Sequence, residues 1–106
     1  MGKKKVLALN SNQKIFYGYY GNLRGVWLQK NQPELFQDLV ENDELDKYLE
    51  SYQKSYALKA QRLFTKLEEE RGVNSDLYHN DYLSYMGLEY RISQEVKKIL
   101  KKEIEQ

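Results

Sequence analysis

The side chains that most often carry chemistry in small proteins are scarce in this sequence. Its 106 residues contain one histidine, His79, and no cysteine. Because zinc sites need several Cys or His ligands and thiol chemistry needs a cysteine, neither is expected. The glycines Gly18, Gly21 and Gly25 lack the spacing and the final lysine of a phosphate-binding P-loop. We therefore predict no catalytic residue, no metal site and no bound cofactor, and we interpret the chain as a binding protein rather than an enzyme.

Aromatic side chains are the most distinctive binding candidates. The sequence has 10 Tyr and one Trp, and tyrosine joins a large apolar ring to a hydroxyl, which suits surfaces that become buried on binding. A tyrosine can equally fill the edge of a core. Aromatic residues crowd positions 17–27, however, where one helix face cannot bury them all. We expect a protein-binding patch of aromatic and acidic residues, namely Tyr17, Tyr19, Tyr20, Trp27, Tyr48, Glu34, Asp38 and Glu41.

The charges of the chain nearly cancel, but they are segregated along the sequence. With 17 Lys plus Arg and 16 Asp plus Glu, the net charge is +1, which excludes a uniformly basic protein that binds duplex DNA. Residues 1–33 nevertheless contain six basic residues and no acid, whereas residues 34–51 contain seven acids and one lysine. A local DNA contact therefore stays open, with the candidates Lys3, Lys4, Lys5, Lys14, Arg24 and Lys30.

Apolar spacing predicts the elements that would position these residues. Apolar residues recur every three or four positions, which is typical of amphipathic helices. We predict helices over residues 20–30, from Pro33 to about residue 42, over about 28 residues from Leu45, and from residue 80 or 81 to near the C-terminus. The last two should pack antiparallel, with the first two laid across them. A short β-hairpin is predicted within residues 6–17.

The expected fold class is thus mainly α, a single small domain of about four helices. Residues 1–18 form its basic N-terminal segment with the hairpin, and residues 19–106 form the helical domain. On the last helix, Glu89 falls on the apolar face, where a carboxylate needs a partner. Arg24 is the candidate partner, so we predict an Arg24–Glu89 ion pair. The alternative is a half-exposed Glu89 at the edge of the apolar face of the last helix.

One set of spaced residues extends from residue 20 to near the C-terminus. It comprises Tyr20-Gly21-Asn22-Leu23-Arg24, Leu28, Lys30, Pro33-Glu34-Leu35-Phe36, Leu39, Leu45, Leu49, Gly72-Val73, Leu77, Asp81, Tyr85, Ile92, Ile99 and Glu103. In these residues the chain resembles the TnpV family, small proteins encoded in transposons and related mobile elements of Gram-positive bacteria. It departs from the family pattern at Tyr85 and Tyr90, where Trp and Asn are usual, and at Lys97 and Lys98, which replace a typically acidic pair. The resemblance implies a mobile-element accessory protein and supplies no reaction, cofactor or catalytic residue.

Two functions from different classes follow from these observations. The first is a non-enzymatic accessory protein that binds a protein partner, such as a host or element-encoded nuclease or recombinase. By ecological analogy, one such role is inhibition of a host defence nuclease, for example a CRISPR effector. The second is a DNA-binding accessory factor in transposon excision or transposition. We expect a cytoplasmic protein, because cysteine is absent and no apolar run approaches membrane-spanning length, and surplus aromatic residues also suit a homodimer.

Overall fold

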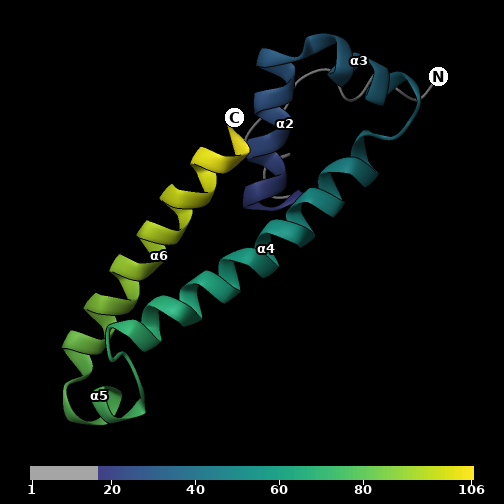
Figure 1. Cartoon of the computed structure of the whole chain (residues 1–106). Helices are drawn as coiled ribbons and strands as arrows, with labels where there is room; N and C mark the ends of the chain where they lie inside the picture. The colour runs from purple at the N-terminus through teal and green to yellow at the C-terminus, as the bar shows by residue number, and fades with distance from the viewer. Residues whose placement is uncertain (1–16) are drawn as a thin grey trace.

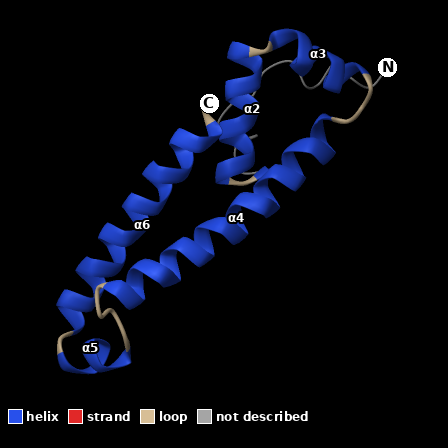
Figure 2. Cartoon of the chain, viewed as in Figure 1, coloured by secondary structure: helices blue, strands red, loops and turns tan. Residues whose placement is uncertain are grey.

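A computed structural model describes residues 17–106 of the chain, and residues 19–104 form five helices (Figure 1). Their bounds are α2 Tyr19–Asn31, α3 Pro33–Glu41, α4 Leu45–Glu70, α5 Ser75–Asn80 and α6 Tyr82–Ile104. No strand lies within residues 17–106 (Figure 2). The mainly α fold class is therefore confirmed, with the short α5 added to the four predicted helices. The predicted hairpin falls almost entirely outside the described residues.

Local sequence signals explain where these helices begin and end. Pro33 occupies the first turn of α3, where its missing N–H has no intrahelical partner to lose. At the end of α4, Gly72 adopts a left-handed φ of 67°, and the N–H of Val73 donates to the carbonyl of Glu68 at 2.9 Å. This pattern closes many helix C-termini, because it satisfies carbonyls that the helix leaves free. The side chain of Asp81 accepts from the N–H of Ser84 and so starts α6.

The two long helices form an antiparallel hairpin that is closed by α5, as predicted (Figure 1). One side of α6 supplies the buried side chains Ile92, Val96, Leu100 and Ile104. Partly buried residues of α4, from Tyr52 to Leu67, pack against them. The hairpin makes the molecule elongated, with extents of 58 × 24 × 18 Å.

The N-terminal helices cover one end of this hairpin. Helix α2 contacts both α4 and α6, and α3 packs on α2 and α4. A second core cluster forms there from Tyr17, Leu28, Phe36, Val40, Leu45 and Leu49. Gly21 allows the close approach, because a Cβ at this position would lie 2.8 Å from the carbonyl oxygen of Leu49. The molecule therefore has two unlike ends, a head built from α2, α3 and the ends of α4 and α6, and a tip built around α5.

Candidate protein-binding site

Arg24 fixes the geometry of the head. Its Nη1 donates to the carbonyl of Ile104 at 2.8 Å, and its Nε donates to the hydroxyl of Tyr48 at 3.3 Å. The guanidinium carbon also lies 4.3 Å from the ring centroid of Trp27 and 5.1 Å from that of Tyr52. Since the last carbonyls of a helix lack partners and carry a partial negative charge, a cation there stabilises the end of α6. Arg24 therefore holds α2, α4 and α6 together.

The predicted ion pair between Arg24 and Glu89 is wrong. Glu89 lies 15 residues before Ile104 on α6, which is about 22 Å at 1.5 Å per residue. Glu89 instead neighbours Glu68 of α4, and burial, followed by the hydrogen bond and the charge of Glu68, raises the pKa of Glu89 to about 7. The Oε2 atom of Glu89 is buried without a hydrogen-bond partner among the described residues. The helical period correctly predicts that Glu89 faces α4. It does not determine at which end of α6 the helix α2 packs, so it could not identify the neighbour of Glu89.

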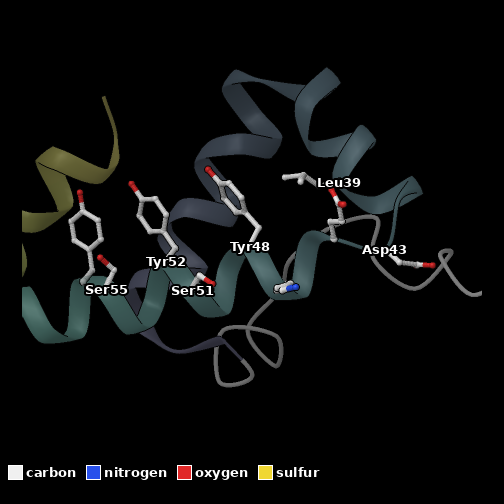
Figure 3. Close-up of a pocket in the computed structure, with 9 residues that line it drawn as sticks. Leu39, Asp43, Tyr48, Ser51, Tyr52 and Ser55 are labelled. Atoms are coloured by element: carbon white, nitrogen blue, oxygen red, sulfur yellow. The ribbon is translucent and has the colours of Figure 1, made fainter.

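Three tyrosines spaced four residues apart form a ladder along α4. The ring centroids of Tyr48 and Tyr52 are 6.0 Å apart, and those of Tyr52 and Tyr56 are 4.9 Å apart. Figure 3 shows Tyr48 and Tyr52 projecting from the same side of α4, with Ser51 and Ser55 close to the helix. Burial, followed by the hydrogen bond with Tyr56, raises the pKa of Tyr52 to about 12. The hydroxyl of Tyr52 therefore stays neutral at physiological pH.

An open groove runs beside this tyrosine ladder. It has a volume of about 670 Å³ and is also lined by Leu39, Asp43, Glu44 and Lys47. In Figure 3, Leu39 and Asp43 lie beyond Tyr48, toward the start of α4. The groove thus combines an aromatic wall with two carboxylates and one lysine, Lys47. Such a surface can hold apolar groups and cations, because cations are attracted both to carboxylates and to aromatic faces.

Exposed carboxylates continue from the groove onto α3. Glu34, Asp38 and Glu41 fall on one face of α3, four and three residues apart, and all three are exposed. The amide of Gln37 donates to Glu41 at 3.2 Å. Asp43 and Glu44 follow α3 directly in the chain and line the groove, and we call the exposed carboxylates of α3 together with these two the acidic corner. It consists of Glu34, Asp38, Glu41, Asp43 and Glu44.

The structure separates the aromatic residues that the sequence grouped into one patch. Tyr17 and Tyr20 are buried, and the hydroxyl of Tyr17 donates to the carboxylate of Asp46. Trp27 is half-buried, and its Nε1 donates to the carbonyl of Glu105 at 3.0 Å. Among the predicted aromatic residues, Tyr19 is exposed and Tyr48 lines the groove. The prediction failed because α2 packs against three other helices, so more than one of its faces is covered.

Of the predicted DNA contacts, the structure leaves only Lys30 exposed among the residues it describes. Lys3, Lys4, Lys5 and Lys14 lie outside that range. Arg24 is used inside the head, as its contacts with Ile104 and Tyr48 show.

Two groups of candidate residues were missed by the sequence analysis. The first consists of Tyr52, Tyr56, Asp43 and Glu44 of the groove. The second consists of four exposed lysines near the end of α6, namely Lys97, Lys98, Lys101 and Lys102. The four-residue spacing of the tyrosines and the paired lysines are both visible in the sequence, but the fold was needed to show which of them stay accessible.

The described residues contain no group of three or more His, Cys, Asp or Glu side chains that could hold a metal ion. The single histidine, His79, lies exposed on α5, with its Nδ1 2.7 Å from the carbonyl oxygen of Ser75. No helix within residues 17–106 has the length and apolar character needed to cross a membrane.

Comparison with known proteins gives one match that covers nearly the whole chain. A family model described as "Transposon-encoded protein TnpV" matches residues 6–104. The match includes every described helix and begins upstream of the motif at Tyr20. No curated protein and no solved structure matches the chain.

Proposed function

The chain belongs to the TnpV family of transposon-encoded proteins, and from this premise we propose that it is a non-enzymatic accessory protein of a mobile element that acts by binding a protein partner. The binding surface is the acidic corner together with the adjoining tyrosine-lined groove. The observation that carries this proposal is the arrangement of exposed carboxylates around an open aromatic groove at the head of the molecule.

The chemistry of this surface favours a partner with a basic surface. Asp38 and Glu41 project from α3, and Asp43 and Glu44 line the mouth of the groove. A concentrated negative field steers a positively charged partner toward it and disfavours acidic ones. The rings of Tyr48 and Tyr52 can then bury apolar area, as aromatic residues at interface centres commonly do.

Proteins that handle DNA carry such basic surfaces, because they must neutralise phosphates. The proposed partner is therefore a nuclease or a recombinase, encoded by the host or by the element. A small acidic protein seated in a DNA-binding channel would exclude DNA from it. One form of this proposal is inhibition of a host defence nuclease, such as a CRISPR effector, because a mobile element benefits when such a nuclease is blocked.

Affinity capture with charge-reversed variants tests the proposal. The tagged protein is incubated with nuclease-treated lysate of the host, and recovered proteins are quantified by mass spectrometry. The variant D38K/E41K reverses two charges of the acidic corner, and E69K/E70K reverses two exposed charges at the far end of α4. We expect a DNA-binding protein to be recovered with wild type and with E69K/E70K but not with D38K/E41K. Equal recovery with all three proteins would overturn the assignment of the site.

A second candidate function, DNA binding, is favoured by the lysines of α6. Lys98 and Lys102 are exposed and one helical turn apart, as are Lys97 and Lys101, although Lys101 also pairs with Glu105 at 3.5 Å. Lysines of this kind can contact successive phosphates, and the affinity would then fall steeply with salt. Titration of labelled duplex DNA at increasing salt tests this function, with K98E/K102E as the variant. Binding that is undetectable at low salt, or that is unchanged in the variant, would exclude this surface as a DNA contact.

A further inference from the structure

The outward face of α6, near the tip of the molecule, carries large apolar side chains that stay largely exposed, although Tyr82 also contacts the ring of Tyr78 of α5, with the two centroids 5.2 Å apart. Leu83 is 82% exposed and Tyr90 is 67% exposed, and Tyr82 and Met86 are each about half exposed. The core residues Ile92 and Val96 lie on the opposite side of the same helix. Single exposed apolar residues are ordinary, but here four of them fall within nine consecutive residues of one helix.

The spacing of this patch is that of a helix that packs against another helix. Leu83, Met86 and Tyr90 are three and four residues apart, which places them along one stripe. Gly87 lies beside the stripe, and a Cβ built there would meet no atom within 4 Å. A shallow groove of about 440 Å³, lined by residues including Leu83, Gly87 and Arg91, marks the same place. The face therefore offers both protruding side chains and a gap that can receive one.

We propose that this face is a two-fold interface between two copies of the chain, with their α6 helices antiparallel. When Met86 of one copy is set opposite Gly87 of the other, the two-fold axis also sets Leu83 opposite Tyr90. The side chain of Met86 in each copy then packs into the open space beside Gly87 of the other copy, so this contact occurs twice in each dimer. An isologous contact requires this kind of self-complementarity.

The charges of α6 select the antiparallel arrangement. Leu83, Met86, Gly87 and Tyr90 are uncharged, and the charged residue of the shallow groove beside them is Arg91. Farther along α6, Lys98 and Lys101 are exposed, and Lys97 lies over the ring of Tyr19 of α2, 5.2 Å from its centroid. A parallel pair would bring these lysines against their own copies, and like charges in contact are destabilising. An antiparallel pair centred between Met86 and Gly87 places the two sets of lysines at opposite ends of the dimer.

Disulfide trapping between two single-cysteine variants tests both the interface and its direction. The chain contains no cysteine, so every disulfide must involve an introduced thiol. L83C and Y90C are prepared separately, given tags of different mass, mixed and oxidised mildly. The proposal predicts that L83C–Y90C heterodimers exceed both homodimers several-fold, because those two positions face each other and like positions are about 10 Å apart along the axis.

The matched control is K66C, at an exposed position of α4, which should form no more disulfide than random collision gives. An excess of like-with-like disulfides would show a parallel pair and overturn the proposal. Disulfide yields no higher than those of K66C would also overturn the proposal, and the patch would then be expected to bind a partner other than a second copy of the chain.

Sedimentation velocity provides an independent readout without cysteine. The patch is small for an interface, so the dissociation constant should lie in the range of about 10 to 100 µM. L83D should weaken dimerisation at least about tenfold, because it sets a carboxylate in the apolar contact. L58D carries the same change at an exposed leucine of α4 and should dimerise like wild type, and circular dichroism verifies that both variants are folded. Wild-type protein that stays monomeric up to about 500 µM would overturn the proposal.

Discussion

Arg24 is the residue on which the arrangement of the head depends most. Its guanidinium donates to the carbonyl of Ile104 and to the hydroxyl of Tyr48, and it lies over the ring of Trp27. Three elements that are distant in sequence thus share one side chain.

Replacing Arg24 by Ala should destabilise the protein by about 1 to 3 kcal/mol, because it removes charge-assisted hydrogen bonds and leaves the carbonyl of Ile104 without its donor. R24K should recover only part of this loss, since lysine lacks the planar fork that reaches two acceptors. Urea unfolding followed by circular dichroism measures both changes. Lys30, exposed on the same helix, provides the control K30A, which should change the stability by less than about 0.5 kcal/mol. Equal stabilities of R24A and K30A would contradict the role of Arg24.

The carboxyl pair Glu68 and Glu89 should make the stability depend on pH. The pKa of Glu89 is raised to about 7 in the folded protein from its ordinary value of 4.5. Folding therefore favours the protonated form, and this contribution is complete below pH 4.5 and is lost as the pH rises through about 7. The free energy of unfolding should accordingly fall between pH 5 and pH 8 by about 1 kcal/mol, a value reduced for solvent screening at a half-exposed site.

E89Q should remove most of this pH dependence and should be more stable than wild type at pH 8, because the amide stays neutral. E69Q changes an exposed glutamate of the same helix turn as Glu68 and should retain the wild-type profile. Urea titrations at several pH values provide the measurement. A wild-type slope in E89Q would show that another group titrates.

At the scale of elements, the helices were predictable because their signals are local. The bounds of α3, α4 and α6 follow from Pro33, from the left-handed Gly72 and from the cap at Asp81. Their apolar periodicity also predicted the antiparallel pairing of α4 and α6. These features depend on residues within a few positions of one another, so a single sequence contains them.

The arrangement of the head was not predictable in the same way. The contact between Arg24 and Ile104 joins residues that are 80 positions apart in the sequence. Its acceptor is a backbone carbonyl, so the types of side chain in the sequence do not indicate it. Side-chain types alone therefore favour Glu89 as the partner of Arg24 and an exposed position for Tyr17 and Tyr20, whereas both tyrosines are buried. The groove was missed for a related reason, because it exists only where the tyrosines of α4 meet the end of α3.

Two glycines test how closely the elements approach each other. G21A should destabilise the protein by about 1 to 3 kcal/mol, because the new methyl group would lie 2.8 Å from the carbonyl oxygen of Leu49. G87A should instead stabilise the monomer by up to about 1 kcal/mol, since alanine is the better helix former and nothing lies within 4 Å of the new atom. Thermal unfolding at low protein concentration compares the two. Effects of the same sign would contradict the packing of α2 on α4.

At the scale of the whole molecule, the fold separates two surfaces of different chemistry. The acidic corner and the tyrosine-lined groove lie at the head, and the apolar stripe of α6 lies near the tip, along a molecule 58 Å long. A dimer formed through α6 would therefore leave both heads free for partners.

Binding through the acidic corner should weaken as salt increases, because screening reduces the attraction between exposed charges. We expect the affinity for the captured partner to fall severalfold between low salt and about 0.5 M, mainly through slower association. Surface plasmon resonance at several salt concentrations measures this dependence. The variant D38K/E41K should show a weaker slope, and an unchanged slope would place the electrostatic contact elsewhere.

The central claim is that the acidic corner binds a DNA-handling protein at its DNA-binding surface. The most direct measurement is the affinity of the captured partner for wild-type protein, D38K/E41K and E69K/E70K, each with and without saturating duplex DNA. We predict that D38K/E41K binds at least about tenfold more weakly, the difference that 1.4 kcal/mol produces, whereas E69K/E70K binds like wild type. Duplex DNA should compete with wild-type protein for the partner. Equal affinities for all three proteins, or binding that DNA leaves unchanged, would contradict the claim.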